Sequence, residues 1–180
     1  MVSTLQAISG AGHPGVSSHD ILGNVIPFIP FEEEKSENET KKILGSLLQD
    51  QFQSSTMTIS THCNRVPVQH GHMACVSAQF ETAPKLEEIV KTWEEFSSLP
   101  QKLELPSAPK TPLLYNPSSF YPQPKHISSE NDMAILVGRL RECSSLDIRF
   151  VGLSHNAVRG AAGGGLLNME LLLIVHFMST

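Results

Sequence analysis

Short strand-like segments come in adjacent pairs along this chain. Residues 57–65 and 72–80 form one pair, and residues 132–140 and 146–154 form another. In the first pair apolar residues fall on alternate positions, which is typical of strands with one buried face. Because a short connection joins antiparallel strands, each pair predicts a hairpin.

Helical patterns separate these pairs. Residues 84–96 carry apolar side chains at i, i+3, i+4 and i+7, which predicts an amphipathic helix. Residues 31–49 predict another helix, in which Ser36 and Glu39 fit a capping box. The apolar stripe of that helix comprises Ile43, Leu44, Leu47 and Leu48.

Residues 155–173 predict a last helix, with Asn156 as its N-cap. Residues 21–29 read as one further strand, and residues 99–126, with seven of the twelve prolines, as an extended loop. The order of elements predicts one α+β (mixed α/β) domain, in which helices cover a largely antiparallel sheet.

Composition narrows the function classes. Apolar residues make up 40% and charged residues 17% of the 180 residues, a globular balance, and the net charge of −5 gives no basic patch for nucleic acid. Three cysteines lack disulfide or zinc spacing, so we expect a reducing compartment, the cytoplasm. The chain starts without a signal-peptide pattern, and we expect its apolar ending, interrupted by Glu170 and His176, to be too short for a membrane span.

The segment HCNRVPVQHGH, residues 62–72, concentrates reactive side chains. In a hairpin with its connection at 66–71, Arg65 and His72 would face each other, about 5 Å apart at Cβ. Arginine suits a carboxylate and histidine suits proton transfer near neutral pH. The alternative is a surface arginine and a strand-end histidine without a catalytic role.

A metal site in this segment is not expected. His62 and Cys63 are adjacent in a strand and point to opposite faces, so they cannot easily share an ion. His70 and His72 alone supply too few ligands.

Two further groups have both a structural and a functional interpretation. Glu39 and Lys42 form either a solvated helix pair or a site for an anionic, amine-bearing substrate. The segment HNAVRGAAGGG, from residue 155, either allows tight helix packing or admits a flat ligand. It is a weak nucleotide motif, because it does not match Gly-x-Gly-x-x-Gly after a strand.

Seven segments occur together in a familiar order: LQAISGAGHPG, NVIPFI, ENETKKILG, CNRVPVQHGH, SAPKTP, AILVGRLRE and LSHNAVRGAAGG. In that order and spacing, over residues 3–171, the chain resembles aspartate-semialdehyde dehydrogenases, most of all their fungal and archaeal-type branch. The resemblance implies the second, glyceraldehyde-3-phosphate-dehydrogenase-like domain of the family enzyme, residues 1–154, followed by a helix and divergent tail, 155–180. That helix packs on the Rossmann domain in the family.

The resemblance also implies chemistry. The family uses NADP and a cysteine nucleophile to interconvert L-aspartyl-4-phosphate and L-aspartate 4-semialdehyde, a step in lysine, threonine and methionine synthesis, and its members form homodimers or homotetramers. The matched positions imply catalytic His72 and Gln6; substrate binding by Arg65, Glu39 and Lys42; and a cofactor contact at Asn156, Gly160 and Ala161.

The matched segments do not include the family's Rossmann domain or the segment that carries its cysteine nucleophile. We therefore expect this chain alone to be inactive, and an exposed apolar surface where the Rossmann half would dock. The alternatives are a non-catalytic dimerisation or regulatory fragment, and an N-acetyl-glutamyl-phosphate reductase-type semialdehyde dehydrogenase.

Overall fold

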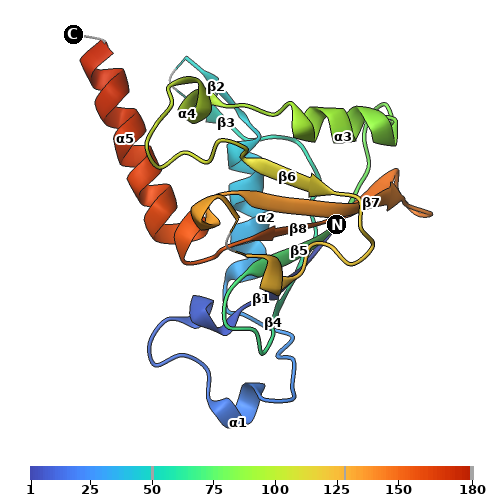
Figure 1. The fold of residues 1–180 in the computed structure, drawn as a ribbon. Helices are drawn as coiled ribbons and strands as arrows, with labels where there is room; N and C mark the ends of the chain where they lie inside the picture. The colour runs from blue at the N-terminus through green and yellow to red at the C-terminus, as the bar shows by residue number, and fades with distance from the viewer. Residues whose placement is uncertain (50, 128, 179–180) are drawn as a thin grey trace.

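A computed structural model describes residues 1–49, 51–127 and 129–178. Six strands form one sheet in the order β4-β1-β5-β8-β7-β6 (Figure 1). The strands are β1 (Val2–Gln6), β4 (Thr61–Arg65), β5 (His72–Ala78), β6 (Leu113–Asn116), β7 (Ile135–Glu142) and β8 (Ile148–Ser154). Only the β1–β4 and β6–β7 pairs are parallel, so the predicted α+β class with a largely antiparallel sheet is confirmed.

Strand β1 lies between β4 and β5 and pairs with both. The prediction that 57–65 and 72–80 pair directly as a hairpin is therefore wrong. Alternation within a strand reports which face is buried, but it does not name the neighbouring strand. The second predicted pair is confirmed, because β7 and β8 are antiparallel neighbours.

Helix α3 (Leu86–Glu94) confirms the clearest helical pattern of the sequence. Its Trp93 ring lies 5.7 Å from the ring of Tyr115 in β6 and 5.2 Å from that of Phe150 in β8. Aromatic pairs at these distances stabilise packing beyond the area they bury. The apolar stripe of α3 is therefore matched by a surface of the same chain.

Helix α2 (Glu32–Ile43) is shorter than predicted. The chain leaves it at Leu44 and forms a separate hairpin of β2 (Ser46–Leu48) and β3 (Gln51–Gln53). Ser36 lies inside the helix, so the predicted capping box is wrong. The helix instead begins after Phe31, which has a left-handed φ of 64° and is 82% exposed.

Two loop and strand predictions also change. Residues 21–29 form no strand, and only Ile26 makes an isolated bridge, to Arg65. The proline-rich stretch contains β6 as well as a short helix, α4 (Leu99–Lys102). Proline is tolerated beside an edge strand such as β6, because no outer neighbour requires its missing N–H.

Short helical turns complete the fold. They are a 3-10 turn at Ile8–Ala11, helix α1 (Ser18–Ile21), 3-10 turns at Pro124–His126 and Ser129–Asp132, and a π turn at Val158–Ala162. Helix α1 lies at the opposite end of the molecule from the β2–β3 hairpin (Figure 1).

Helix α5 (Gly163–Met178) follows the π turn and packs along one side. Its Leu167 forms a buried cluster with Leu105 and Met133, and its Glu170 accepts hydrogen bonds from the backbone and hydroxyl of Ser107. Asn156 does not cap this helix, contrary to prediction, because its side-chain amide binds Ser9 and Gly71.

By length and composition, the 19-residue helical stretch Val158–His176 could cross a membrane. The expectation from the sequence that the ending is too short for a membrane span is therefore wrong. One such helix is weak support for a membrane span, and the packing of Leu167 and Glu170 ties one of its sides to the rest of the chain.

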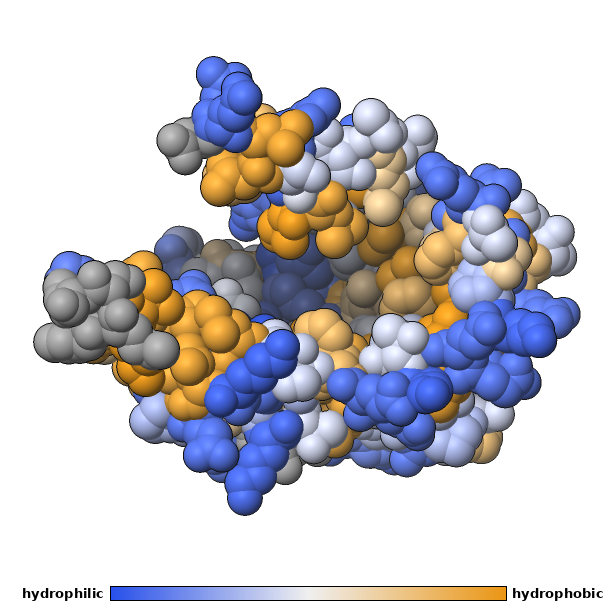
Figure 2. Space-filling model, turned by 90° about the horizontal axis from the view of Figure 1, so that it is seen from above, coloured by the Kyte–Doolittle hydropathy of each residue, from blue (hydrophilic) through white to orange (hydrophobic). Residues whose placement is uncertain are grey.

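Much apolar surface remains open. Figure 2 shows orange side chains on both sides of a hollow, on the face that carries the end of α5 and the β2–β3 hairpin. The exposed side chains are Leu166, Met169, Leu172 and Leu173 in α5, and Leu44, Leu47, Leu48 and Phe52 near the hairpin. An exposed apolar face on the last helix was expected from the sequence, and it is present.

Candidate active site

Three polar side chains lie in a row across the sheet at the ends of β4, β1 and β5. Gln6 is in register with Arg65 on one side, and on the other side Leu5 pairs with Met73, which places Gln6 beside His72. Gln6 and Arg65 are each 6% exposed. Buried polar groups of this kind need defined partners.

The backbone of Ala7 provides two of those partners. Its carbonyl accepts a hydrogen bond of 2.8 Å from Nη1 of Arg65, and its N–H donates one of 3.1 Å to Nδ1 of His72. Because that N–H can only donate, neutral His72 carries its proton on Nε2. Each side chain is thus fixed in orientation by the backbone of the same residue.

Gly10 lies directly over both side chains. A Cβ atom at this position would come within 2.7 Å of Nε2 of His72 and 3.0 Å of Nη1 of Arg65. The structure therefore places Arg65 and His72 at one site, but not as directly opposed residues of a hairpin about 5 Å apart, as the sequence predicted, because β1 lies between their strands.

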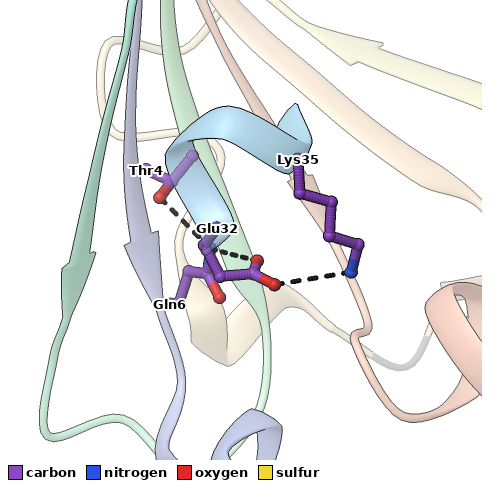
Figure 3. Close-up of polar contacts among 4 residues, drawn as sticks. All are labelled: Thr4, Gln6, Glu32 and Lys35. Carbon is purple, nitrogen blue, oxygen red and sulfur yellow. Dashed lines mark hydrogen bonds and ion pairs between the residues drawn. The ribbon is translucent and has the colours of Figure 1, made fainter. Parts of the chain in front are cut away.

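Helix α2 adds a carboxylate, from Glu32, and an ammonium group, from Lys35, to this row. Gln6 donates hydrogen bonds from Nε2 to Glu32, at 3.2 Å, and to Thr4, at 3.4 Å. Lys35, one turn along the helix, forms an ion pair of 3.4 Å with Glu32 (Figure 3). The first turn of α2 thus presents one negative and one positive group beside Gln6.

The environment shifts the pKa values of these groups. Burial would raise the pKa of Glu32, but the hydrogen bond from Gln6 and the charge of Lys35 lower it overall. Burial and then the charge of Arg65 lower the pKa of His72 below its ordinary value of 6.5, which favours the neutral ring at neutral pH. Burial also lowers the pKa of Arg65, and the guanidinium stays charged at neutral pH.

These side chains line a cavity of about 790 Å³. Its lining also includes Asn156, Gly160 and Ala161, the three residues expected to contact a cofactor. Asn156 accepts a hydrogen bond of 2.9 Å from the Gly71 backbone and donates one of 2.8 Å to Ser9. A cavity of this size suits a small molecule held by a few polar groups.

Glu39 and Lys42 lie outside this cavity. Both are exposed, and the Lys42 ammonium lies over the Phe52 ring, 5.4 Å from its centroid. The Glu-x-x-Lys spacing occurs twice in α2, and the earlier copy, Glu32 and Lys35, lines the cavity. The copies are seven residues apart on nearly the same helix face, so the sequence signal exists but periodicity does not discriminate between them.

None of the three cysteines lines the cavity. Cys63 is fully buried in β4, whereas Cys75 is exposed and Cys143 half-buried. Within the described residues there is no cluster of three or more histidine, cysteine, aspartate or glutamate side chains that could hold a metal ion.

Comparison with known proteins identifies the family. Residues 1–159 match the family model described as semialdehyde dehydrogenase, dimerisation domain. The aspartate-semialdehyde dehydrogenases of Schizosaccharomyces pombe and Methanothermobacter thermautotrophicus are 47% and 42% identical over 94% and 95% of this chain, which spans 49% and 50% of their lengths.

A solved structure agrees. The crystal structure of aspartate semialdehyde dehydrogenase with NADP from Candida albicans has a TM-score of 0.87 and 42% identity, over 95% of this chain and 49% of that one. The chain thus spans about half the length of the relatives it matches, and the resemblance to their fungal and archaeal branch is confirmed. This chain belongs to the semialdehyde dehydrogenases and constitutes the dimerisation domain of that family.

Proposed function

We propose that this chain is the substrate-binding and dimerisation part of an NADP-dependent aspartate-semialdehyde dehydrogenase. The observation that supports this most is the grouping of Arg65, Gln6, His72, Glu32 and Lys35 around one cavity. A substrate with an α-carboxylate, an α-amine and an acyl phosphate needs a cation, an anion and a second cation in one place.

Each group has a proposed partner. Arg65 binds the α-carboxylate, since its guanidinium is held in plane by Ala7. Glu32 binds the substrate ammonium and Lys35 the phosphate, in place of their present ion pair. Glu32 and Lys35 therefore replace Glu39 and Lys42 in this proposal.

His72 handles the proton. Its neutral ring carries a proton on Nε2, so it can donate to an oxyanion that develops at the reacting carbonyl. Gln6, whose amide nitrogen is bound to Glu32 and Thr4, orients the same carbonyl region.

The wall formed by Gly160 and Ala161 suits a nicotinamide ring. A Cβ atom at Gly160 would meet no atom closer than 3.7 Å, so the backbone there can be approached closely. When bound, NADP would supply or accept the hydride. We propose that Asn156 holds this wall in place through Ser9 and Gly71.

The thiol nucleophile is proposed to come from outside these 180 residues, because none of the cysteines here reaches the cavity. The purified chain is then expected to give no NADP reduction above background with the semialdehyde and phosphate. Turnover by the chain alone would contradict an external nucleophile.

Ligand binding tests the site itself. Calorimetry with L-aspartate 4-semialdehyde is expected to give saturable binding that Arg65→Gln weakens at least tenfold, about the effect of leaving a carboxylate without its partner. Lys35→Gln should weaken phosphate binding, whereas the matched Lys42→Gln should not. Equal affinity of wild type and Arg65→Gln would refute the assignment.

The proposed assembly is a homodimer, in line with the description of the matched family. Sedimentation of the purified chain should give twice the 19.7 kDa chain mass at micromolar concentration. A concentration-independent monomer would contradict self-association of this part.

A further inference from the structure

Helix α2 has no buried residue, although it presents Glu32 and Lys35 to the cavity. Apolar packing therefore does not fix its position. Two other carboxylates of the helix contact the sheet instead. Glu33 accepts a hydrogen bond of 2.9 Å from the backbone N–H of Cys63, and Glu37 accepts one of 2.9 Å from that of Thr61.

These bonds close the outer edge of β4. This strand is the last of the sheet on its side, so its outward N–H groups lack a neighbouring strand. Those groups belong to Thr61, Cys63 and Arg65, and the third donates to the Ile26 carbonyl at 2.8 Å. Every second N–H of β4 thus has a partner from segment 26–37.

The spacing of Glu33 and Glu37 along the helix matches the spacing of successive outward N–H groups along β4. Four residues of α-helix rise about 6 Å, and two residues of β-strand rise about 6.6 Å. Glu33 and Glu37 therefore meet successive outward N–H groups of β4 without bending either element. Two contacts along the axis fix both the rotation and the axial position of α2.

Rotation and axial position decide which of the two Glu-x-x-Lys pairs reaches the cavity. Glu33 follows Glu32 by about 100° around the helix, so while Glu33 contacts β4, Glu32 lies beside Gln6. Arg65 is the last residue of the same strand. The two glutamates thus connect the helix that carries the acid and base to the strand that carries the arginine.

We propose that Glu33 and Glu37 are positioning residues for the substrate site, which hold Glu32 and Lys35 in register with Gln6 and Arg65. This rests on the proposed function for its biological meaning, because it assigns the register of that same site. Neither glutamate lines the cavity, so neither contacts substrate.

Amide hydrogen exchange on the full chain tests the contacts. Glu33→Ala should speed exchange at Cys63, and Glu37→Ala at Thr61, each by about tenfold or more, as expected for loss of a hydrogen bond to a charged acceptor. Glu33→Gln keeps an acceptor oxygen and should restore most of the protection. Glu34→Ala, at an exposed position of the same turn, is the matched control and should change neither rate.

The titration of Glu32, followed by NMR of its side-chain carboxyl carbon, tests positioning itself. Its pKa should rise toward the ordinary value in Glu33→Ala and Glu37→Ala, because the helix no longer holds Glu32 against Gln6. It should stay low in Glu33→Gln and Glu34→Ala. If an alanine variant does not fold, the amide exchange rates of Glu33→Gln can still be compared with those of wild type. The largest change in exchange rate should then occur at Cys63.

The outcomes separate the two proposals. Faster exchange with an unchanged Glu32 titration would make the glutamates merely structural and overturn the positioning role. A shifted Glu32 titration in a chain whose wild type does not bind the semialdehyde would support the positioning role and reject the proposed substrate.

Discussion

Helices α5 and α2 are attached to the rest of the molecule in different ways. Helix α5 is held by burial of Leu167 against Leu105 and Met133, and by hydrogen bonds from Ser107 to Glu170. Helix α2 has no buried residue and is held by the carboxylates of Glu32, Glu33 and Glu37. Helix α5 therefore combines apolar contact, which is insensitive to direction, with hydrogen bonds, whereas α2 depends on hydrogen bonds, which require correct geometry.

The two kinds of contact have different effects: apolar burial mainly provides binding strength, and hydrogen bonds mainly fix the position of a helix. Apolar burial can fasten a helix strongly, yet it tolerates small shifts along the helix axis. A hydrogen bond to a charged group contributes less free energy than burial of a large apolar side chain. Its strength, however, falls when the distance between donor and acceptor changes by a few tenths of an ångström. The helix that carries the proposed substrate-binding groups has no buried residue and is held by directional contacts.

The largest effect is expected at the buried contact of α5. Leu167→Ala should lower the free energy of unfolding by about 2–5 kcal/mol, because it leaves a cavity in the cluster. The control Leu172→Ala, at a position 71% exposed, should change it by less than about 0.5 kcal/mol. Urea denaturation measures both, and similar losses would show that α5 is not attached through one side.

A smaller gain is expected at the start of α2. Phe31 has a left-handed backbone, which a Cβ atom disfavours, so Phe31→Gly should stabilise the chain by about 0.5–1 kcal/mol. Phe31→Ala retains the Cβ atom and serves as the control. If the glycine variant is no more stable than the alanine variant, backbone strain does not burden this helix.

The charged contacts of α2 should depend on pH. The pKa of Glu32 is lower in the folded chain than its ordinary 4.5, so its stabilising effect is complete above pH 4.5 and lost as the pH falls through the folded value. Wild type should thus lose more stability than Glu32→Gln between pH 5 and pH 3. Parallel losses in urea titrations would mean that Glu32 contributes no such dependence.

The smallest effect on stability is expected on the open side of α5. Leu173→Glu, at a position 51% exposed, should change the free energy of unfolding by less than about 0.5 kcal/mol while reducing nonspecific self-association. Denaturation and light scattering would separate these effects. A marked loss of stability would place Leu173 in a contact that holds the fold.

Prediction from the sequence succeeded for elements whose hydrophobic pattern and pairing partners lie close together along the chain. The stripe of α3 and the β7–β8 pair follow from local periodicity. Periodicity did not reveal β1, because five residues at the start of the chain give a weak signal and its partners are more than fifty residues away. The helix predicted at 31–49 failed at its end, where Leu47 and Leu48 continue an apolar stripe that is in fact exposed.

The candidate site shows the same limit. Arg65, His72, Gln6 and the Asn156 segment all line one cavity, as their positions in the family motifs suggested. Glu39 and Lys42 could not be separated from Glu32 and Lys35 by pattern, because the pair that lines the cavity is fixed by tertiary contacts such as those of Glu33 and Glu37 with β4.

The place of β1 has a consequence for how the chain folds. Residues 61–65 and 72–78 cannot close on each other as a local hairpin, because the first strand of the chain must enter between them. Contacts between such distant segments form slowly and late compared with local ones. The row of Arg65, Gln6 and His72 therefore depends on contacts between segments that are far apart along the chain, with β1 in place between β4 and β5.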